Sequence, residues 1–232
     1  MNRCRAFKNV THVIFDLDGV LLDTEKLYTL GVQNVVNNYG KVYNWSAKSQ
    51  VMGLPGADAA KKIVELLELP ISPEEFYKLA KIQYALVLKD AEIIQGAARV
   101  VKHLHKNNIP IAVATSSSQD SFTLKTAKHK DFFSLFSHVV CGGSDPEVKG
   151  GKPKPDIFLV CASRFLDKPH PEKCLVFEDA PNGVKAALAA GMQVVMIPDE
   201  NVPVELRKDA HVVVNSLETA PLDLFGLPPL SS

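Results

Sequence analysis

The sequence lacks an excess of charge of either sign and any long apolar run, and each absence excludes a class of protein. Its 26 Lys and Arg residues balance 26 Asp and Glu residues, so the whole chain has no bulk attraction to nucleic acid or to an anionic membrane surface. No stretch of the sequence approaches the roughly 20 apolar residues of a membrane span. We therefore expect neither a nucleic-acid polymer nor a membrane among the partners.

Cysteine is also scarce, and its spacing carries information. The four cysteines are Cys4, Cys141, Cys161 and Cys174. None of them forms a CxxC pair, so a structural zinc site is not expected. Reduced, mostly buried thiols fit a reducing compartment, and the N-terminus shows no long apolar segment of the secretory type. We expect a cytoplasmic protein that acts as a monomer.

Apolar runs alternate with helical patterns along most of the chain. Predicted strands cover residues 10–17, 109–114, 138–141, 174–177, 193–197 and 211–214. Apolar residues at three- and four-residue intervals predict helices between them, near residues 97–104, 122–130, 156–165 and 182–190. Alternating strands and helices predict an α/β fold, with a doubly wound, Rossmann-like parallel sheet covered on both faces.

One long segment departs from this alternation because it is purely helical. Its predicted helices cover residues 24–39, 57–67 and 73–86. Since the segment interrupts the pattern directly after the first strand, we interpret it as an insertion. The predicted organisation is a core domain of residues 1–22 and 92–232 with an inserted α-helical cap domain of residues 23–91.

Polar side chains follow the predicted strands at the edge of the sheet where ligands bind in open parallel α/β folds. In chain order they are Asp16, Asp18, Thr115 to Ser117, Lys152, Glu178 and Asp179. Four carboxylates cannot all be ionised at close range without a compensating cation. Oxygen ligands at a partly open site suit Mg²⁺. We therefore expect a magnesium site among the four acidic residues.

The residues of this predicted site have the chemical groups that hydrolysis of a phosphate ester needs. Asp16 would be the nucleophile on phosphorus, because covalent catalysis by a carboxylate splits one difficult step into two. Asp18 would protonate the leaving oxygen and later deprotonate the attacking water. Thr115 and Ser116, with amides at a helix start, would hold the phosphoryl oxygens. Lys152 would neutralise the charge that develops in the transition state.

Each motif taken alone also has a purely structural interpretation. Paired aspartates before a glycine commonly form turns. A Thr-Ser-Ser sequence commonly caps a helix, and Glu178 with Asp179 could do the same. Lys152 could be a solvated loop charge. The occurrence of all four motifs in this order, each at the end of a predicted strand or in the loop beyond it, favours a catalytic site.

Four segments contain these residues: FDLDGVLLDTE, ATSS, GKPKPDIF and VFEDAPNGVKAALAAGM. They resemble the four motifs of the haloacid dehalogenase superfamily of phosphohydrolases. The resemblance implies that Asp16 is the nucleophile and Asp18 the general acid and base. It also implies that Mg²⁺ is bound by Asp16, Asp179 and the main-chain carbonyl of Asp18, with Glu178 supporting the metal directly or through water. The helical insertion resembles the type-1 cap of that family, which closes over the site.

The likeness extends from about residue 11 to residue 228 and implies a small phosphorylated substrate, with a nucleoside monophosphate favoured. Residues of the cap would read the rest of the substrate, and the candidates are Thr24, Tyr28 and Gly53. Phosphatases of deoxysugar or glycerol phosphates stay an alternative, because cap loops decide the choice of substrate.

Three further activities are less favoured by the sequence. Sugar phosphomutases of this fold carry a histidine where Tyr28 stands and a phosphate-binding arginine where Gly56 stands. A non-catalytic binding protein would have lost an aspartate or the lysine, and Asp16, Asp18, Lys152 and Asp179 are all present. Dehalogenases need no metal, so the Glu178-Asp179 pair favours phosphoryl transfer over dehalogenation.

Overall fold

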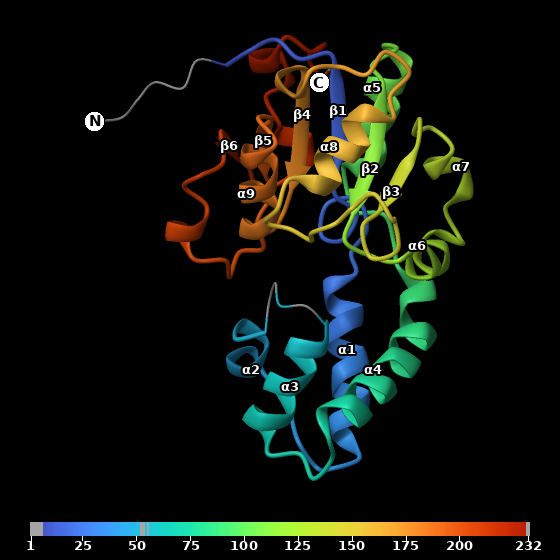
Figure 1. Cartoon of the computed structure of the whole chain (residues 1–232), viewed down its shortest axis with the longest axis vertical. Coiled ribbons are helices and arrows are strands. Elements are labelled where there is room, and N and C mark those ends of the chain that lie inside the picture. The colour runs from blue at the N-terminus through green and yellow to red at the C-terminus, as the bar shows by residue number, and fades with distance from the viewer. Residues whose placement is uncertain (1–6, 52–53, 55, 231–232) are drawn as a thin grey trace. The chain divides into compact units, whose positions relative to one another are not determined.

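The computed structural model describes residues 7–51, 54 and 56–230, and the chain divides into two compact units (Figure 1). Of the described residues, the first unit contains 7–22, Ile93–Thr123 and 129–230. The second contains the segments Asp23–Glu92 and Leu124–Lys128. Each unit has its own architecture.

Among the described residues, six strands form one parallel sheet in the first unit. Their order across the sheet is β3 (Val139–Cys141), β2 (Ile111–Thr115), β1 (His12–Phe15), β4 (Cys174–Glu178), β5 (Gln193–Met196) and β6 (Val212–Val213). The strands β2 and β3 lie on one side of β1, and the chain then crosses to the other side of β1 to form β4, β5 and β6. Such a switch point opens a crevice beyond the carboxyl ends of the two central strands. The predicted doubly wound, Rossmann-like α/β fold is confirmed.

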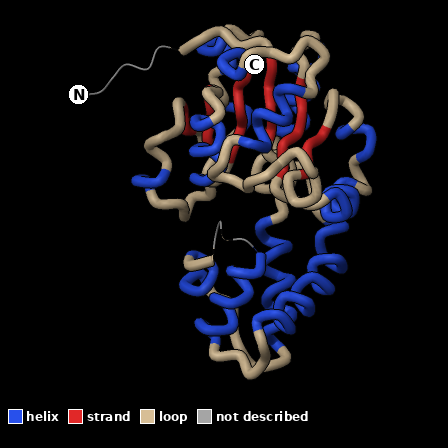
Figure 2. The backbone as a smooth tube through the Cα atoms, viewed as in Figure 1, coloured by secondary structure: helices blue, strands red, loops and turns tan. Residues whose placement is uncertain are grey.

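The sheet is a buried layer flanked by helices (Figure 2). Every residue of β1, β2 and β4 is buried, as expected for parallel strands covered on both faces. Ile14 and Val176 belong to a cluster with buried residues of α8 (Asp156–Ser163) and α9 (Pro181–Ala189). Alternation along the strands turns Phe15 and Phe177 to the opposite face, where their rings stack with centroids 5.0 Å apart.

Three more helices belong wholly or partly to the first unit. They are α5 (Ala97–Lys106), α6 (Gln119–Thr126) and α7 (Lys130–Phe133). The prediction of one helix over residues 122–130 is wrong, because α6 ends before Ala127 and α7 begins at Lys130. The Ala127 amide bonds to the Leu124 carbonyl, an i to i−3 contact that tightens the last turn of α6.

The second unit is helical. Its helices are α1 (Glu25–Asn37), α2 (Trp45–Ser49), α3 (Gly56–Leu67) and α4 (Pro73–Val87). Val32, Ala60 and Phe76 are among the buried residues that give this unit a core of its own. The helix α2 was not predicted, because five residues are too few to show a helical period.

The segment Leu124–Lys128 belongs to this helical unit, although it follows in the sequence a strand of the first unit, β2. Lys128 Nζ lies 2.6 Å from Asp90 Oδ1, and Lys125 Nζ lies 5.0 Å from the centroid of the Tyr28 ring. No helix in the described ranges is both long and apolar enough to cross a membrane.

Candidate active site

Two carboxylates meet at the carboxyl ends of β1 and β4. Asp16 follows β1 directly, and Glu178 is the last residue of β4. The strands pair so that Phe15 lies opposite Phe177, and the Asp16 amide donates to the Phe177 carbonyl at 2.9 Å. Both acidic residues are buried, with 5% of Asp16 and 1% of Glu178 exposed. The register of two central strands therefore fixes the positions of both acids.

Lys152 brings a positive charge to these two acids. It comes from the loop between β3 and α8, and its Nζ lies 2.5 Å from Asp16 Oδ1 and 2.6 Å from Glu178 Oε1. Only 10% of its side chain is exposed. The Lys152 ammonium therefore lies beside the predicted nucleophile Asp16, and the structural alternative of a solvated loop charge is wrong.

The contacts of Lys152 determine its charge. Burial alone would lower the pKa of this lysine, but the Asp16 and Glu178 carboxylates outweigh that effect and raise the pKa above its ordinary value. Lys152 is therefore a cation at neutral pH.

The balance of charge differs at Asp16. Burial raises the pKa of Asp16 to about 7 despite the opposing charge of Lys152, and the carboxylates of Glu178 and Asp18 add to the rise. One lysine thus leaves an excess of negative charge around Asp16. A further cation at this point would offset that excess.

Glu178 also links the site to helix α9. Its Oε2 accepts hydrogen bonds from the amides of Asp179 (3.0 Å) and Ala180 (3.1 Å), where a carboxylate is favourable beside a helix N-terminus. Gly183 in the first turn of α9 makes room for this arrangement, since a Cβ there would lie 1.8 Å from Glu178 Oε1. Gly183 is not among the site residues predicted from the sequence, although a glycine near the start of a helical pattern is a sign of close packing.

Asp179 reaches the turn that follows Asp18. Gly19 has a φ of +79°, and a Cβ at this position would lie 2.2 Å from Asp179 Oδ2. A glycine is therefore required both by the backbone conformation and by the close approach of the carboxylate. The motifs at β1 and β4 meet through this contact as well as through Lys152.

The hydroxyl groups at the end of β2 differ in their contacts. The hydroxyl of the buried Thr115 accepts a hydrogen bond from the Ser117 amide at 3.1 Å, and Ser116 is exposed. The hydroxyl beside Asp18 is that of Ser117, which donates to Asp18 Oδ2 at 3.1 Å. Phosphate binding by Thr115 and Ser116 stays a prediction, and Ser117 joins the site as a residue that contacts Asp18.

Thr24 and Tyr28, two of the residues predicted to recognise the substrate, belong to the helical unit. Thr24 directly precedes α1 and is fully buried. The Tyr28 ring packs edge-to-face against Tyr84, with centroids 5.0 Å apart. Gly53 lies outside the described residues. Recognition of a substrate by these three residues stays a prediction.

Comparison with known proteins gives consistent matches over nearly the whole chain. Residues 10–191 match a family model described as haloacid dehalogenase-like hydrolase. "Probable pseudouridine-5'-phosphatase" of Drosophila melanogaster is 49% identical over 224 residues, which cover 97% of each chain. "(DL)-glycerol-3-phosphatase 2" of Arabidopsis thaliana is 44% identical over 224 residues, covering 95% of this chain and 93% of that protein.

A solved structure is similar over the same extent. The crystal structure titled "putative beta-phosphoglucomutase" from Thermotoga maritima has a TM-score of 0.73 and 30% sequence identity to this chain. The match covers 94% of this chain and 97% of the other.

Proposed function

We infer that this chain, which belongs to the haloacid dehalogenase-like hydrolases, is a magnesium-dependent phosphatase that forms an aspartyl-phosphate on Asp16. Membership of the family and the broader activity, hydrolysis of phosphoric monoesters, rest on the family model and on named phosphatases 49% and 44% identical to it. The metal, the covalent intermediate and the substrate are the proposal. The observation that carries it is the position of Lys152 between Asp16 and Glu178.

The first chemical step uses Asp16 as the nucleophile. Its carboxylate attacks phosphorus, and the bond from phosphorus to the leaving oxygen breaks. Asp18 donates a proton to that oxygen. In the second step a water attacks the phosphorus of the aspartyl-phosphate, Asp18 takes a proton from this water, and Asp16 is released together with inorganic phosphate. Lys152 stabilises the charge on the transferring group throughout.

The donor set fits a magnesium ion. No group of three or more His, Cys, Asp or Glu side chains forms a ready metal site within the described ranges. The proposed ligands need only the carboxylates of Asp16 and Asp179 with the main-chain carbonyl of Asp18, all oxygen donors of the kind Mg²⁺ prefers. Bound Mg²⁺ would polarise the phosphoryl oxygens and offset the excess negative charge around Asp16.

Glu178 has a different set of contacts from Asp179. Both of its oxygens have partners, Lys152 on one side and two amides of α9 on the other. These contacts favour a role in holding Lys152. Direct or water-mediated support of the metal by Glu178 stays a prediction.

The helical segment 23–91 is proposed to act as a cap that closes over bound substrate. The two connections to the core run side by side, since Leu22 forms an antiparallel bridge with Ile93 and the Asp23 amide donates to the Glu92 carbonyl at 2.9 Å. Adjacent connections of this kind suit a hinge, in which a few residues absorb the change in backbone angles.

Replacing Asp18 by asparagine should lower kcat by roughly 10²–10⁴-fold, the usual contribution of a general acid and base. An amide can still accept the hydrogen bond from Ser117 but cannot exchange a proton with the leaving group or water. Phosphate release at saturating substrate measures the effect. Asp223→Asn, at an exposed aspartate remote in sequence from the four motifs, is the matched control and should stay within about two-fold of the wild type. Equal kcat values for the two variants would remove Asp18 from the mechanism.

For the substrate, we propose pseudouridine 5′-phosphate, which would give pseudouridine and inorganic phosphate. The motifs of the core act only on the phosphoryl group, so the choice falls to groups that read the base and ribose. The relative named as a probable pseudouridine-5'-phosphatase supports this choice through its 49% identity along 97% of the chain. Thr24, Tyr28 and Gly53 are the proposed substrate-reading residues.

Glycerol phosphate is the second candidate, because a relative named as a glycerol-3-phosphatase is 44% identical to this chain. A sugar phosphate mutase is disfavoured although one similar structure has that title. A mutase must hold the second phosphate of a bisphosphate intermediate, and this chain has Tyr28 and Gly56 where mutases of this fold have histidine and arginine.

Steady-state kinetics separate the candidate substrates. The value of kcat/KM for pseudouridine 5′-phosphate should exceed those for uridine 5′-phosphate and glycerol 3-phosphate by about tenfold or more, since buried polar groups left unpaired by a wrong ligand discriminate strongly. Uridine 5′-phosphate is the sharper control, because it differs only in how base and ribose are joined. A kcat/KM for pseudouridine 5′-phosphate no higher than that for either control would exclude the substrate and leave the phosphatase activity standing.

A further inference from the structure

Lys152 stands near the end of a long loop that connects β3 to α8. Residues 142–155 of this connection form no helix or strand. A lysine side chain has several rotatable bonds, so the position of its ammonium depends on how firmly the backbone beneath it is held. The contacts of this loop therefore bear directly on the charge beside Asp16.

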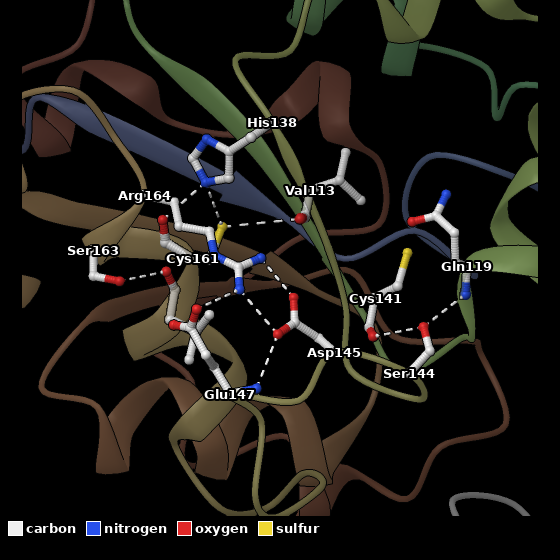
Figure 3. Close-up of polar contacts among 11 residues, drawn as sticks. Val113, Gln119, His138, Cys141, Ser144, Asp145, Glu147, Cys161, Ser163 and Arg164 are labelled. Atoms are coloured by element: carbon white, nitrogen blue, oxygen red, sulfur yellow. Dashed lines mark hydrogen bonds and ion pairs between the residues drawn. The ribbon is translucent and has the colours of Figure 1, made fainter.

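The beginning of the loop is tied to the end of β2. The Gly142 amide donates to the Thr115 carbonyl at 2.8 Å, and the Gly143 amide donates to the Ser117 carbonyl at 3.2 Å. Ser144 Oγ accepts a hydrogen bond from the Gln119 amide at 3.0 Å (Figure 3). The lysine loop and the Thr-Ser-Ser segment are thus joined through their backbones.

A bidentate ion pair then fixes the loop to the far end of α8. Arg164, which directly follows α8, places Nη1 2.5 Å from Asp145 Oδ2 and Nη2 2.9 Å from Asp145 Oδ1 (Figure 3). Asp145 Oδ1 also accepts from the Glu147 amide at 3.1 Å, and the Asp145 amide donates to the Cys141 carbonyl at 2.8 Å. The Asp145 side chain is 11% exposed and that of Arg164 is 31% exposed, so the pair is partly shielded from water.

The near end of α8 holds the other half of the loop. Asp156, the first residue of α8, accepts hydrogen bonds on Oδ2 from the amides of Lys149 (3.0 Å) and Gly150 (2.8 Å). Phe158 on the same helix lies beneath the lysine, with Lys152 Nζ 5.1 Å from its ring centroid. The loop is therefore attached to both ends of α8, and the side chain of Lys152 packs against Phe158 of the same helix.

From these contacts we propose that Arg164 and Asp145 are positioning residues for catalysis, which set the place of the Lys152 ammonium without touching substrate. The proposal rests on the proposed function, because it needs Lys152 to act in phosphoryl transfer. Asp145 is the residue at which a charged, two-point contact joins the loop to the end of α8, and Arg164 Nη2 also lies 3.2 Å from Glu147 Oε1 of the same loop. Loss of this contact would release the loop between Ser144 and Lys149 and loosen the position of Lys152.

The chemistry of the pair suits this task. A planar guanidinium that binds both oxygens of a carboxylate fixes an orientation as well as a distance. Hydrogen bonding from Arg164 holds the pKa of Asp145 below its ordinary value, so the pair is charged at neutral pH. A partly buried bidentate pair is also stronger than most exposed pairs.

Arg164→Gln tests the proposal with Mg²⁺ and p-nitrophenyl phosphate, a phosphomonoester that needs no recognition of base or sugar. We expect kcat to fall about 10- to 100-fold, the scale of a displacement of about 1 Å in a catalytic group, while KM stays within about three-fold. Arg164→Lys keeps the charge but loses the two-point geometry and should give an intermediate kcat. The control Glu172→Gln breaks the exposed ion pair with Lys8 and should leave kcat unchanged.

A double-mutant cycle separates positioning from general weakening of the fold. In a Lys152→Gln background, Arg164→Gln should lower the remaining kcat by less than about two-fold, because its effect passes through the lysine. An unchanged kcat in Arg164→Gln, or a full additive loss in the Lys152→Gln background, would overturn the proposal. Wild-type protein that released no phosphate from any phosphomonoester with Mg²⁺ would instead contradict the proposed function itself.

Discussion

Asp16→Asn should abolish phosphate release and leave the fold intact. Asparagine is nearly isosteric with aspartate and keeps one oxygen that can accept the hydrogen bond from Lys152. An amide is a poor nucleophile toward phosphorus, so the first step of the covalent mechanism has no substitute. Phosphate release from several phosphomonoesters, measured with and without the substitution, gives the size of the loss.

The environment of Asp16 makes this test informative. Asp16 is buried at the end of a central strand, and its backbone amide donates a hydrogen bond to the Phe177 carbonyl. A neutral side chain at this position therefore leaves the backbone in place. The thermal unfolding midpoint of Asp16→Asn should therefore stay close to that of the wild type or rise. The substitution removes a buried carboxylate whose charged form is disfavoured by burial and by the neighbouring carboxylates. Near-normal turnover in a variant that folds normally would rule out an aspartyl-phosphate at this position.

Removal of divalent metal should also eliminate activity. With EDTA, only Lys152 would offset the negative charge around Asp16, and the phosphoryl group would bring further negative charge. Added Mg²⁺ should restore activity, and Ca²⁺ should inhibit, because its looser coordination displaces the in-line arrangement of the reacting atoms. Calorimetric titration of Mg²⁺ gives a second readout that does not depend on turnover.

The same titration identifies the ligands. Asp179→Asn should weaken Mg²⁺ binding strongly, whereas the control Asp223→Asn should bind as the wild type does. Full activity of protein shown to be free of divalent metal would contradict the magnesium assignment. It would also revive the metal-independent alternatives that the Glu178-Asp179 pair disfavours.

Much of the fold could be predicted because hydrophobic periodicity reports burial directly. The buried strands β1 and β4 are mostly apolar in sequence, and the acids at their carboxyl ends, Asp16, Glu178 and Asp179, fall at one edge of a parallel sheet. Short elements leave a weaker trace. The short helix α2 is capped by Asn44, whose side chain accepts a hydrogen bond from the Ala47 amide, and five residues show no helical period.

The detailed contacts of the site could not be predicted, because they depend on loop conformation. The sequence identifies the hydroxyls of Thr115, Ser116 and Ser117 at the end of β2, but only the backbone conformation decides that Ser117 contacts Asp18. In the same way, Lys152 is recognisable as a candidate, while the ion pair of Arg164 with Asp145 joins residues 19 positions apart that share no motif. Long-range polar contacts of this kind have no periodic signal in the sequence.

Direct detection of a phosphorylated Asp16 tests the central claim most closely. Asp18→Asn should accumulate the intermediate from p-nitrophenyl phosphate, because this substrate has a good leaving group and hydrolysis of the aspartyl-phosphate lacks its base. After an acid quench and proteolysis, mass spectrometry should find one added phosphoryl group on the peptide containing Asp16, and none in Asp16→Asn. A phosphoryl group on another residue, or none on Asp16 while Asp18→Asn still releases p-nitrophenol, would contradict the account.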